Sequence, residues 1–167
     1  MNVRRIVYLV PLMVCLLAAG GVMAQSTTDG IEGTVMDDAG MTLPGVTVVI
    51  SPLIALMQDQ VDALRANGVR AACYNSSLGA AEARDVLDAL HRGELDLLYV
   101  APERIMRPGF LHTLEQLPVA LIAIDEAHCV SMWGHDFRPE YHGLAVLAER
   151  FPGIPRLALT ATADPPT

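Results

Sequence analysis

The chain has 167 residues, which is enough for one ordinary domain, and its 52% hydrophobic and 18% charged residues are typical of a globular protein. Its 11 basic and 19 acidic residues give a net charge of -8, which excludes long-range attraction to nucleic acid as a source of binding. Any contact with nucleic acid must therefore come from a local basic site, and every basic residue available for it is an arginine.

The first 24 residues have the three parts of a secretory signal peptide. Arg4 and Arg5 supply a positive start, residues 6–19 form an apolar signal helix, and VMA at 22–24 precedes a cleavage point. An uncleaved membrane anchor is the alternative, although the apolar run is short for a membrane span. The signal implies export to the periplasm or envelope, with no stable membrane span once it is removed.

Residues 25–46 predict a short β-hairpin. The residues around GTV and PGV have the composition of strands, and DDAG between them is a turn sequence. The stretch GTVMDDAGMTLPGVTV resembles the start of the small regulatory-like β-domain that precedes the plug in many TonB-dependent outer-membrane receptors. Together with the signal, this resemblance implies a segment of an exported envelope protein.

From Thr47 onward, strands and helices are predicted to alternate, which is typical of a parallel sheet flanked by helices in an α/β protein. The predicted strands are residues 47–50, 69–74, 95–102, 119–124 and 156–163. The predicted helices are residues 51–68, 80–92, 110–117 and 141–150.

Two of these helices have clear signals in the sequence. The first has Ser51 as its N-cap, Pro52 in its first turn and Gly68 at its end. Its predicted apolar face is Leu53, Leu56, Met57, Val61 and Leu64. The second helix is predicted to turn Ala83, Val86, Leu87 and Leu90 inward.

Four polar or turn-forming residues fall at or near the carboxyl ends of predicted strands: Ser51, Pro102, Asp125 and Thr160. Ligand sites in open α/β sheets lie outside these ends. The sequence therefore predicts one shared site along this edge of the sheet.

The fourth strand ends in Asp125-Glu126-Ala127-His128. A carboxylate at the end of a buried strand is costly unless a cation or hydrogen-bond donors meet it. Magnesium takes one carboxylate together with phosphate oxygens and waters, which suits Asp125. Glu126 could orient or deprotonate a water molecule, and His128 could connect the site to a neighbouring element.

Two other interpretations of this segment are open. The acidic pair could cap the N-terminus of a helix with all its carboxylate oxygens satisfied. A zinc site built from His128, Cys129 and His135 is a further alternative, although the spacing of these residues is irregular.

The cysteines favour a different cellular compartment from the one that the export signal implies. Cys15 lies in the signal, and Cys73 and Cys129 lie far apart in apolar surroundings. No disulfide framework or zinc pair follows from that spacing, so we expect buried free thiols. Such thiols suit a reducing compartment.

Four motifs resemble RecQ-family DNA helicases in order and spacing: SPLIALMQDQVDAL, YVAPERI, IDEAHCVSMWGHDFRPEY and LALTATAD. The resemblance covers residues 47–164 and implies a partial RecA-like sheet of the P-loop NTPase type, with ATP and Mg²⁺ as cofactors and DNA as partner. It implies that Asp125 holds magnesium, that Glu126 activates water, and that His128 couples to Thr160 and Thr162.

The same resemblance assigns residues to the DNA path: Ser51, Pro52, Leu53, Pro102, Glu103, Arg104, Trp133, His135, Phe137 and Arg138. The loop from Trp133 to Tyr141 looks like the aromatic-rich loop that senses single-stranded DNA. Aromatic faces stack on bases of any sequence, and Arg138 can add a phosphate contact. Ordinary core packing of Trp133 and Phe137 is the alternative.

The chain departs from the RecQ pattern upstream of Thr47, where the phosphate-binding loop and its strand are expected. No G-x-x-x-x-G-K-[ST] motif occurs, and the chain has no lysine. We expect a signal peptide at 1–24, a truncated receptor-like segment at 25–46 and a partial motor domain at 47–167, joined from two unrelated genes. The helicase resemblance implies a cytoplasmic location, which conflicts with the export signal. A motor segment, an exported envelope protein and a non-functional fusion therefore remain competing hypotheses. A processed N-terminus at Gln25 would favour export, and retention in the cytoplasm would favour the motor segment.

Overall fold

The computed structural model describes residues 44–130 and 139–160. These residues belong to one compact unit, which begins at Pro44. The predicted signal at 1–24 and nearly all of the receptor-like hairpin lie outside the described residues and stay predictions. Within the described part of the chain, no helix combines the length and apolar character needed to cross a membrane.

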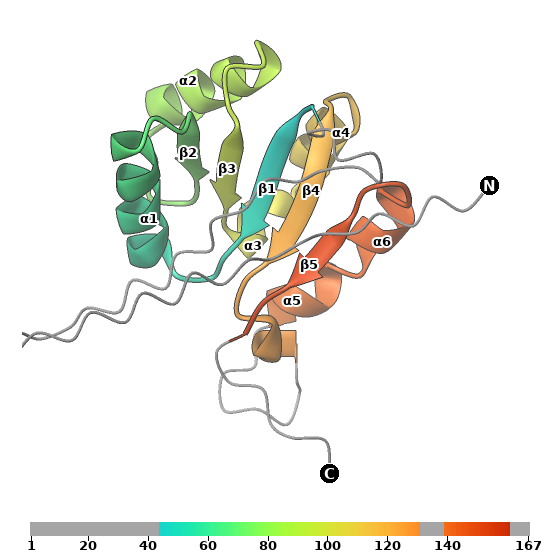
Figure 1. Ribbon diagram of the computed structural model, residues 1–167. Coiled ribbons are helices and arrows are strands. Elements are labelled where there is room, and N and C mark those ends of the chain that lie inside the picture. The colour runs from blue at the N-terminus through green and yellow to red at the C-terminus, as the bar shows by residue number, and fades with distance from the viewer. Residues whose placement is uncertain (1–43, 131–138, 161–167) are drawn as a thin grey trace, which may run out of the picture. The chain divides into compact units, whose positions relative to one another are not determined.

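The described residues form a five-stranded sheet in which every pairing is parallel. Its strands are β1 (Val46–Ile50), β2 (Ala71–Tyr74), β3 (Leu97–Val100), β4 (Val119–Ile124) and β5 (Arg156–Ala158). They lie in the order β2-β3-β1-β4-β5, and all five arrows point the same way in Figure 1. The predicted fold class, a parallel sheet with flanking helices, is confirmed.

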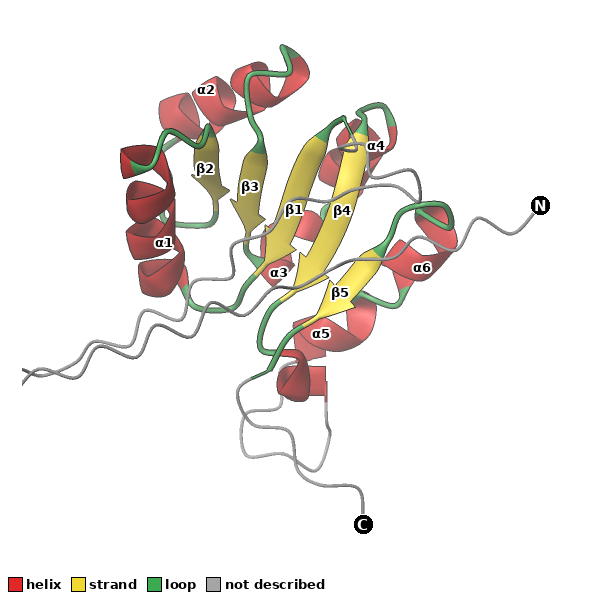
Figure 2. Ribbon diagram, viewed as in Figure 1, coloured by secondary structure: helices red, strands yellow, loops and turns green. Residues whose placement is uncertain are grey.

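The helices cover the two faces of the sheet unequally (Figure 2). They are α1 (Ile54–Ala66), α2 (Ala80–His91), α3 (Pro102–Ile105), α4 (Pro108–Glu115), the 3-10 helix η1 (Ala127–Val130), α5 (Pro139–Gly143) and α6 (Val146–Arg150). Helix α1 packs over β2 and β3 on one face. Residues of α2 to α6 join the larger core on the opposite face.

Successive side chains of a strand point to opposite faces of the sheet, so one strand contributes to the cores on both faces. In β3, Leu98 and Val100 are fully buried in the larger core, whereas Leu97 and Tyr99 pack against the α1 side. Three of the four residues predicted to line the inner face of α2 are partly buried against the core, and Leu90 is buried. The amphipathic interpretation of that helix is confirmed.

Helix α1 begins later than the sequence predicted. Its N-cap is Leu53, in an extended conformation, and the helix starts at Ile54 rather than at Ser51. The Ser51 hydroxyl is not a helix cap because it donates a hydrogen bond to a side chain on a different element, described below. Leu53, predicted on the apolar face, is 41% exposed.

Other elements also differ from the sequence predictions. Strands β2 and β3 are shorter than predicted, and α4 begins and ends two residues earlier. The helix predicted over 141–150 is two short helices, α5 and α6, because hydrogen bonds around residues 144–145 join residues three apart and Gly143 favours a break. The strand predicted over 156–163 is described as a strand only at Arg156–Ala158. The short helix α3, which begins at Pro102, was not predicted.

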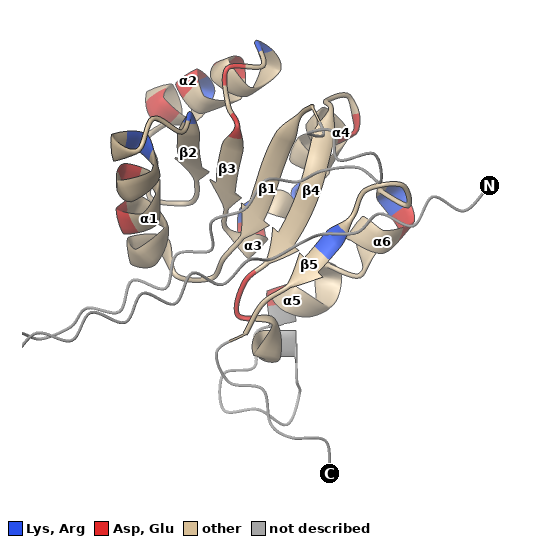
Figure 3. Ribbon diagram, viewed as in Figure 1, with Lys and Arg blue, Asp and Glu red and all other residues tan. Residues whose placement is uncertain are grey.

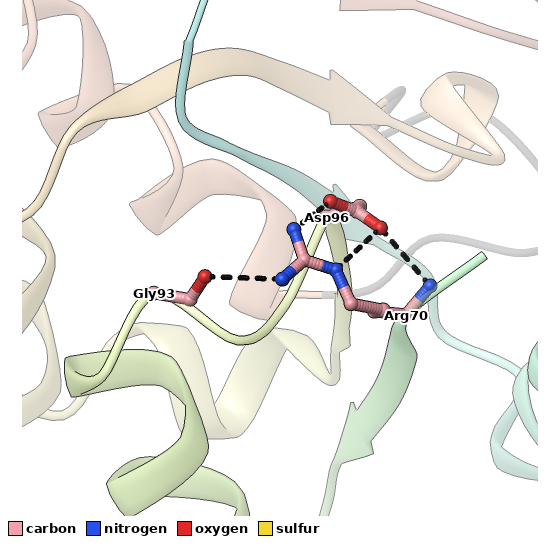
Figure 4. Close-up of polar contacts among 3 residues, drawn as sticks. All are labelled: Arg70, Gly93 and Asp96. Atoms are coloured by element: carbon pink, nitrogen blue, oxygen red, sulfur yellow. Dashed lines mark hydrogen bonds and ion pairs between the residues drawn. The ribbon is translucent and has the colours of Figure 1, made fainter.

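A clamp between Arg70 and Asp96 joins the starts of β2 and β3 at the amino edge of the sheet (Figure 4). The Asp96 carboxylate accepts hydrogen bonds from Arg70 Nε at 3.0 Å and from the Arg70 backbone N–H at 3.1 Å, and it also contacts Arg70 Nη2. In return, the Asp96 N–H donates to the Arg70 carbonyl at 2.8 Å. The side-chain hydrogen bonds from Arg70 lower the pKa of Asp96 from its ordinary value. This clamp fixes the edge opposite to the candidate site.

Candidate active site at the carboxyl edge of the sheet

Backbone hydrogen bonds connect the carboxyl ends of the five strands. In each case the residue just after one strand donates to the last residue of its neighbour: Ala101 to Tyr74 at 3.2 Å, Ser51 to Val100 at 3.2 Å, Asp125 to Ile50 at 2.8 Å and Leu159 to Ile124 at 2.8 Å. The four residues that the sequence placed at strand ends therefore lie along one continuous edge. An acidic segment follows β4 directly on this edge (Figure 3).

Asp125 is held from several directions. Its Oδ2 accepts a hydrogen bond from the Ser51 hydroxyl at 3.1 Å, and its Oδ1 accepts one from the Glu126 N–H at 2.9 Å. The Asp125 carbonyl accepts a hydrogen bond from the Tyr141 hydroxyl at 2.9 Å. The carboxylate is half-buried, and each oxygen keeps a further lone pair for another ligand.

Glu126 has a left-handed backbone conformation with φ of 50°, and it is the one residue other than glycine described with positive φ. Such a conformation costs about 1–3 kcal/mol, and residues held in it cluster at functional sites. The Glu126 N–H bond to Asp125 and the hydrogen bond from the Cys129 N–H to the Glu126 carbonyl, at 2.9 Å, hold it in place. The strain turns the Glu126 side chain away from the direction that a continuing strand would set.

His128 connects the acidic segment to the chain after β5. Its Nδ1 lies 3.2 Å from Glu126 Oε2 and 2.9 Å from Thr160 Oγ1. The two segments are brought together by the Ala127 N–H, which donates to the Leu159 carbonyl at 2.8 Å. The expected contact of His128 with Thr160 is present, whereas Thr162 lies outside the described residues.

The residues assigned to the DNA path differ in exposure. Ser51 is fully buried and Pro102 is buried, so neither side chain offers a surface to a bound strand. Leu53 and Glu103 are exposed, and Pro52 and Arg104 are half-buried. The remaining predicted contacts lie outside the described residues: Trp133, His135, Phe137 and Arg138.

Sequence reasoning missed three tyrosines at this edge. The sequence predicts Tyr141 only as the end of the loop and the start of a helix, and Tyr74 and Tyr99 only as strand residues. Because Tyr74 is the last residue of β2, its position at a strand end is the signal that could have selected it. Tyr99 lies on the α1 side of β3. Burial, with a smaller contribution from the charge of Asp125, raises the pKa of Tyr99 to about 12, so its hydroxyl stays protonated.

The cysteines behave as the sequence predicted. Cys73 and Cys129 are both buried. Burial raises the pKa of the Cys73 thiol to about 11, which keeps it protonated and unreactive at neutral pH.

The donor set at this edge fits magnesium better than zinc. Among the described residues, no group of three or more His, Cys, Asp or Glu side chains is placed to hold a metal ion. A Mg²⁺ ion needs no such cage, because it commonly takes one carboxylate and completes its shell with phosphate oxygens and waters. Asp125, with a free lone pair on each oxygen, suits that use, and His135 of the zinc alternative lies outside the described residues.

Comparison with known families settles the class of protein. A model of the DEAD/DEAH box helicase family matches residues 6–167. The chain belongs to the DEAD/DEAH box helicase family. The range matched to this helicase family includes most of the residues that the sequence assigned to a signal and a receptor-like hairpin, and those two assignments stay predictions.

Relatives of this helicase chain include RecQ proteins. It is 55% identical over 120 residues to the ATP-dependent DNA helicase RecQ of Pasteurella multocida, covering 72% of this chain and 19% of that protein. It is 42% identical over 153 residues to the probable ATP-dependent DNA helicase RecS of Bacillus subtilis, covering 91% of this chain and 30% of that protein. The chain thus spans about a fifth to a third of these relatives.

One solved structure with a similar arrangement is the helicase domain of Hef from Pyrococcus furiosus. The TM-score is 0.48 at 16% sequence identity, covering 72% of this chain and 22% of that one.

Proposed function

We propose that the chain is a motor segment of a RecQ-type ATP-dependent DNA helicase, and that the carboxyl edge of its sheet is the site for magnesium-bound ATP. The observation that carries this proposal is the Asp125 carboxylate. It is fixed by Ser51 and by the Glu126 N–H at the end of a buried parallel strand, beside a strained glutamate and a histidine that contacts Thr160 just after β5.

Each residue of this group has a distinct part in the proposal. Asp125 holds magnesium, which neutralises charge on the phosphates when it is bound. Glu126 orients a water molecule and accepts its proton, and the left-handed turn sets the direction of its carboxylate. His128 links that carboxylate to Thr160 and so passes changes at the nucleotide to the chain beyond β5.

A single-stranded DNA interface along the same edge is the second part of the proposal. Pro52 and Leu53 follow β1, Glu103 and Arg104 follow β3, and all four have exposed or half-exposed side chains. The proposal adds four residues of the aromatic-rich loop, for stacking and phosphate contacts: Trp133, His135, Phe137 and Arg138. The burial of Ser51 and Pro102 leaves them a supporting role.

Direct metal binding tests the nucleotide site without requiring catalysis. Manganese replaces magnesium and is observed by electron paramagnetic resonance of the free ion. We expect weak, saturable Mn²⁺ binding that Asp125→Asn removes. The matched control is Asp59→Asn, which removes an exposed carboxylate of α1 and should leave binding unchanged. Equal Mn²⁺ binding by all three proteins would argue against a site at Asp125.

The 167-residue chain by itself is expected not to hydrolyse ATP. Asp125 provides one metal ligand, but the chain contains no lysine and no phosphate-binding glycine loop to cradle the β- and γ-phosphates. Phosphate release with single-stranded DNA present should equal that of the Glu126→Gln variant. Release clearly above that variant would show that the phosphates are held by other residues.

A further inference from the structure

Arg104 of α3 has an unusual environment for an arginine. Its guanidinium carbon lies 5.2 Å from the centre of the Tyr74 ring. Its Nε is buried and has no hydrogen-bond partner, and its terminal nitrogens form no hydrogen bond or ion pair within the described part of the chain. Only Nε of this unpartnered guanidinium is buried, so solvent reaches the terminal nitrogens.

The Tyr74 ring beneath this guanidinium is firmly fixed. Tyr74 is the last residue of β2 and only 7% exposed, and its ring stacks on Phe110 with centroids 4.8 Å apart and planes inclined by 26°. Its carbonyl accepts a hydrogen bond from the Ala101 N–H at 3.2 Å, directly before α3. The next residue, Asn75, is buried, and its side-chain oxygen accepts hydrogen bonds from Ser77. The ring is therefore a rigid platform that joins β2, α3 and α4.

The balance of forces on Arg104 favours an anionic ligand. The aromatic face attracts the guanidinium and limits its motion, at a gain of about 0.5–2 kcal/mol. A carboxylate partner would compete for the same donors, and none binds Arg104 within the described residues. A planar fork of donors that is held in one orientation and still open to solvent matches the geometry of a phosphate group.

We propose that Tyr74 is a positioning residue, whose ring holds the Arg104 guanidinium in the orientation that binds a phosphodiester of single-stranded DNA. Tyr74 makes no contact with the nucleic acid itself. The inference rests on the DNA interface proposed above, and it adds that the affinity of Arg104 for phosphate depends on an aromatic ring at the end of β2.

The first test measures the contact between Arg104 and the Tyr74 ring in the absence of any ligand. In nuclear magnetic resonance spectra, the side-chain protons of Arg104 should be shifted upfield by the Tyr74 ring current. Tyr74→Phe keeps the ring and should keep that shift, whereas Tyr74→Leu should abolish it in a protein whose other resonances stay dispersed. Unshifted Arg104 protons in the unsubstituted protein would overturn the proposal.

The second test measures binding of a short, labelled oligo-dT by fluorescence anisotropy at low salt. We expect Arg104→Ala to weaken binding about tenfold and Tyr74→Leu about threefold to tenfold, with Tyr74→Phe unchanged. The double variant should bind no more weakly than Arg104→Ala, because both changes remove one interaction. The control Arg107→Ala removes an exposed arginine close by in the sequence and should have the smallest effect.

The outcomes separate the inference from the proposed function. If Arg104→Ala weakens binding and Tyr74→Leu does not, Tyr74 is no positioning residue although the DNA interface stands. If Arg104→Ala does not change the affinity, or if the chain does not bind the oligonucleotide, the role of Tyr74 and the proposed DNA interface are both wrong. Competition by inorganic phosphate or ATP as strong as that by unlabelled oligo-dT would show that Arg104 binds a free phosphate and would overturn the assignment to DNA.

Discussion

Gly45→Ala is expected to destabilise the sheet by about 3 kcal/mol or more, because it adds backbone strain and a steric clash at the same position. Gly45 precedes β1 with φ of 130°, a conformation that residues with a side chain rarely adopt. A Cβ atom at this position would lie 2.1 Å from the Pro118 carbonyl oxygen. That oxygen cannot move away cheaply, because it accepts the hydrogen bond of the Val46 N–H at 2.9 Å, which begins the pairing of β1 with β4.

Chemical denaturation followed by circular dichroism measures this loss as a lower midpoint. The matched control is Gly109→Ala in α4, where a Cβ would meet no atom within 4 Å. Alanine favours a helix more than glycine, so the control should be neutral or more stable by up to about 1 kcal/mol. Equal midpoints for Gly45→Ala and the unsubstituted chain would show that the start of β1 is not as close to Pro118 as described.

Tyr141→Ala is expected to cost about 3–5 kcal/mol of unfolding free energy, in the range measured for removing a large aromatic side chain from a core. Tyr141 is 1% exposed and belongs to the larger core beneath the carboxyl edge. Its hydroxyl also supports the site, because it donates to the carbonyl of Asp125 at 2.9 Å. Its truncation therefore removes packing and loosens the backbone of the proposed metal ligand together.

Tyr141→Phe separates the two contributions. It keeps the ring and removes the hydrogen bond, so the expected loss is about 1–2 kcal/mol. Glu140→Gln, at an exposed position beside it, should change stability by less than about 0.5 kcal/mol. A Tyr141→Phe variant as unstable as Tyr141→Ala would mean that the hydroxyl, rather than the packing of the ring, dominates.

The elements that could be predicted from the sequence are those whose cause is local. Strand β4 has the predicted bounds, because an apolar run between Pro118 and Asp125 leaves little choice of where it starts and ends. Helix α2 begins at the predicted residue and ends one residue early, because an alternation of apolar and polar residues with helical period is followed by Gly93. The alternation of strands and helices also predicted the parallel sheet, and strand ends in such a sheet predicted where Ser51, Asp125 and Thr160 would meet.

The remaining features depend on residues that are distant in the sequence. Ser51 has the residue type and position of a helix cap, and only the placement of β1 beside β4 gives its hydroxyl a partner 74 residues away. Helices α3, α5 and α6 are too short for a periodic pattern of apolar residues to predict them.

The need for glycine at position 45 and the stacking of Arg104, Tyr74 and Phe110 likewise come from the crossing of separate elements. The sequence by itself therefore determined the class of fold, the edge that carries the candidate site and the acidic residues proposed for it, because burial patterns and strand ends are local properties. Only the tertiary structure decided which side chains hold those residues in place, because a hydrogen bond or a ring contact forms only after strand order has brought its two partners within reach.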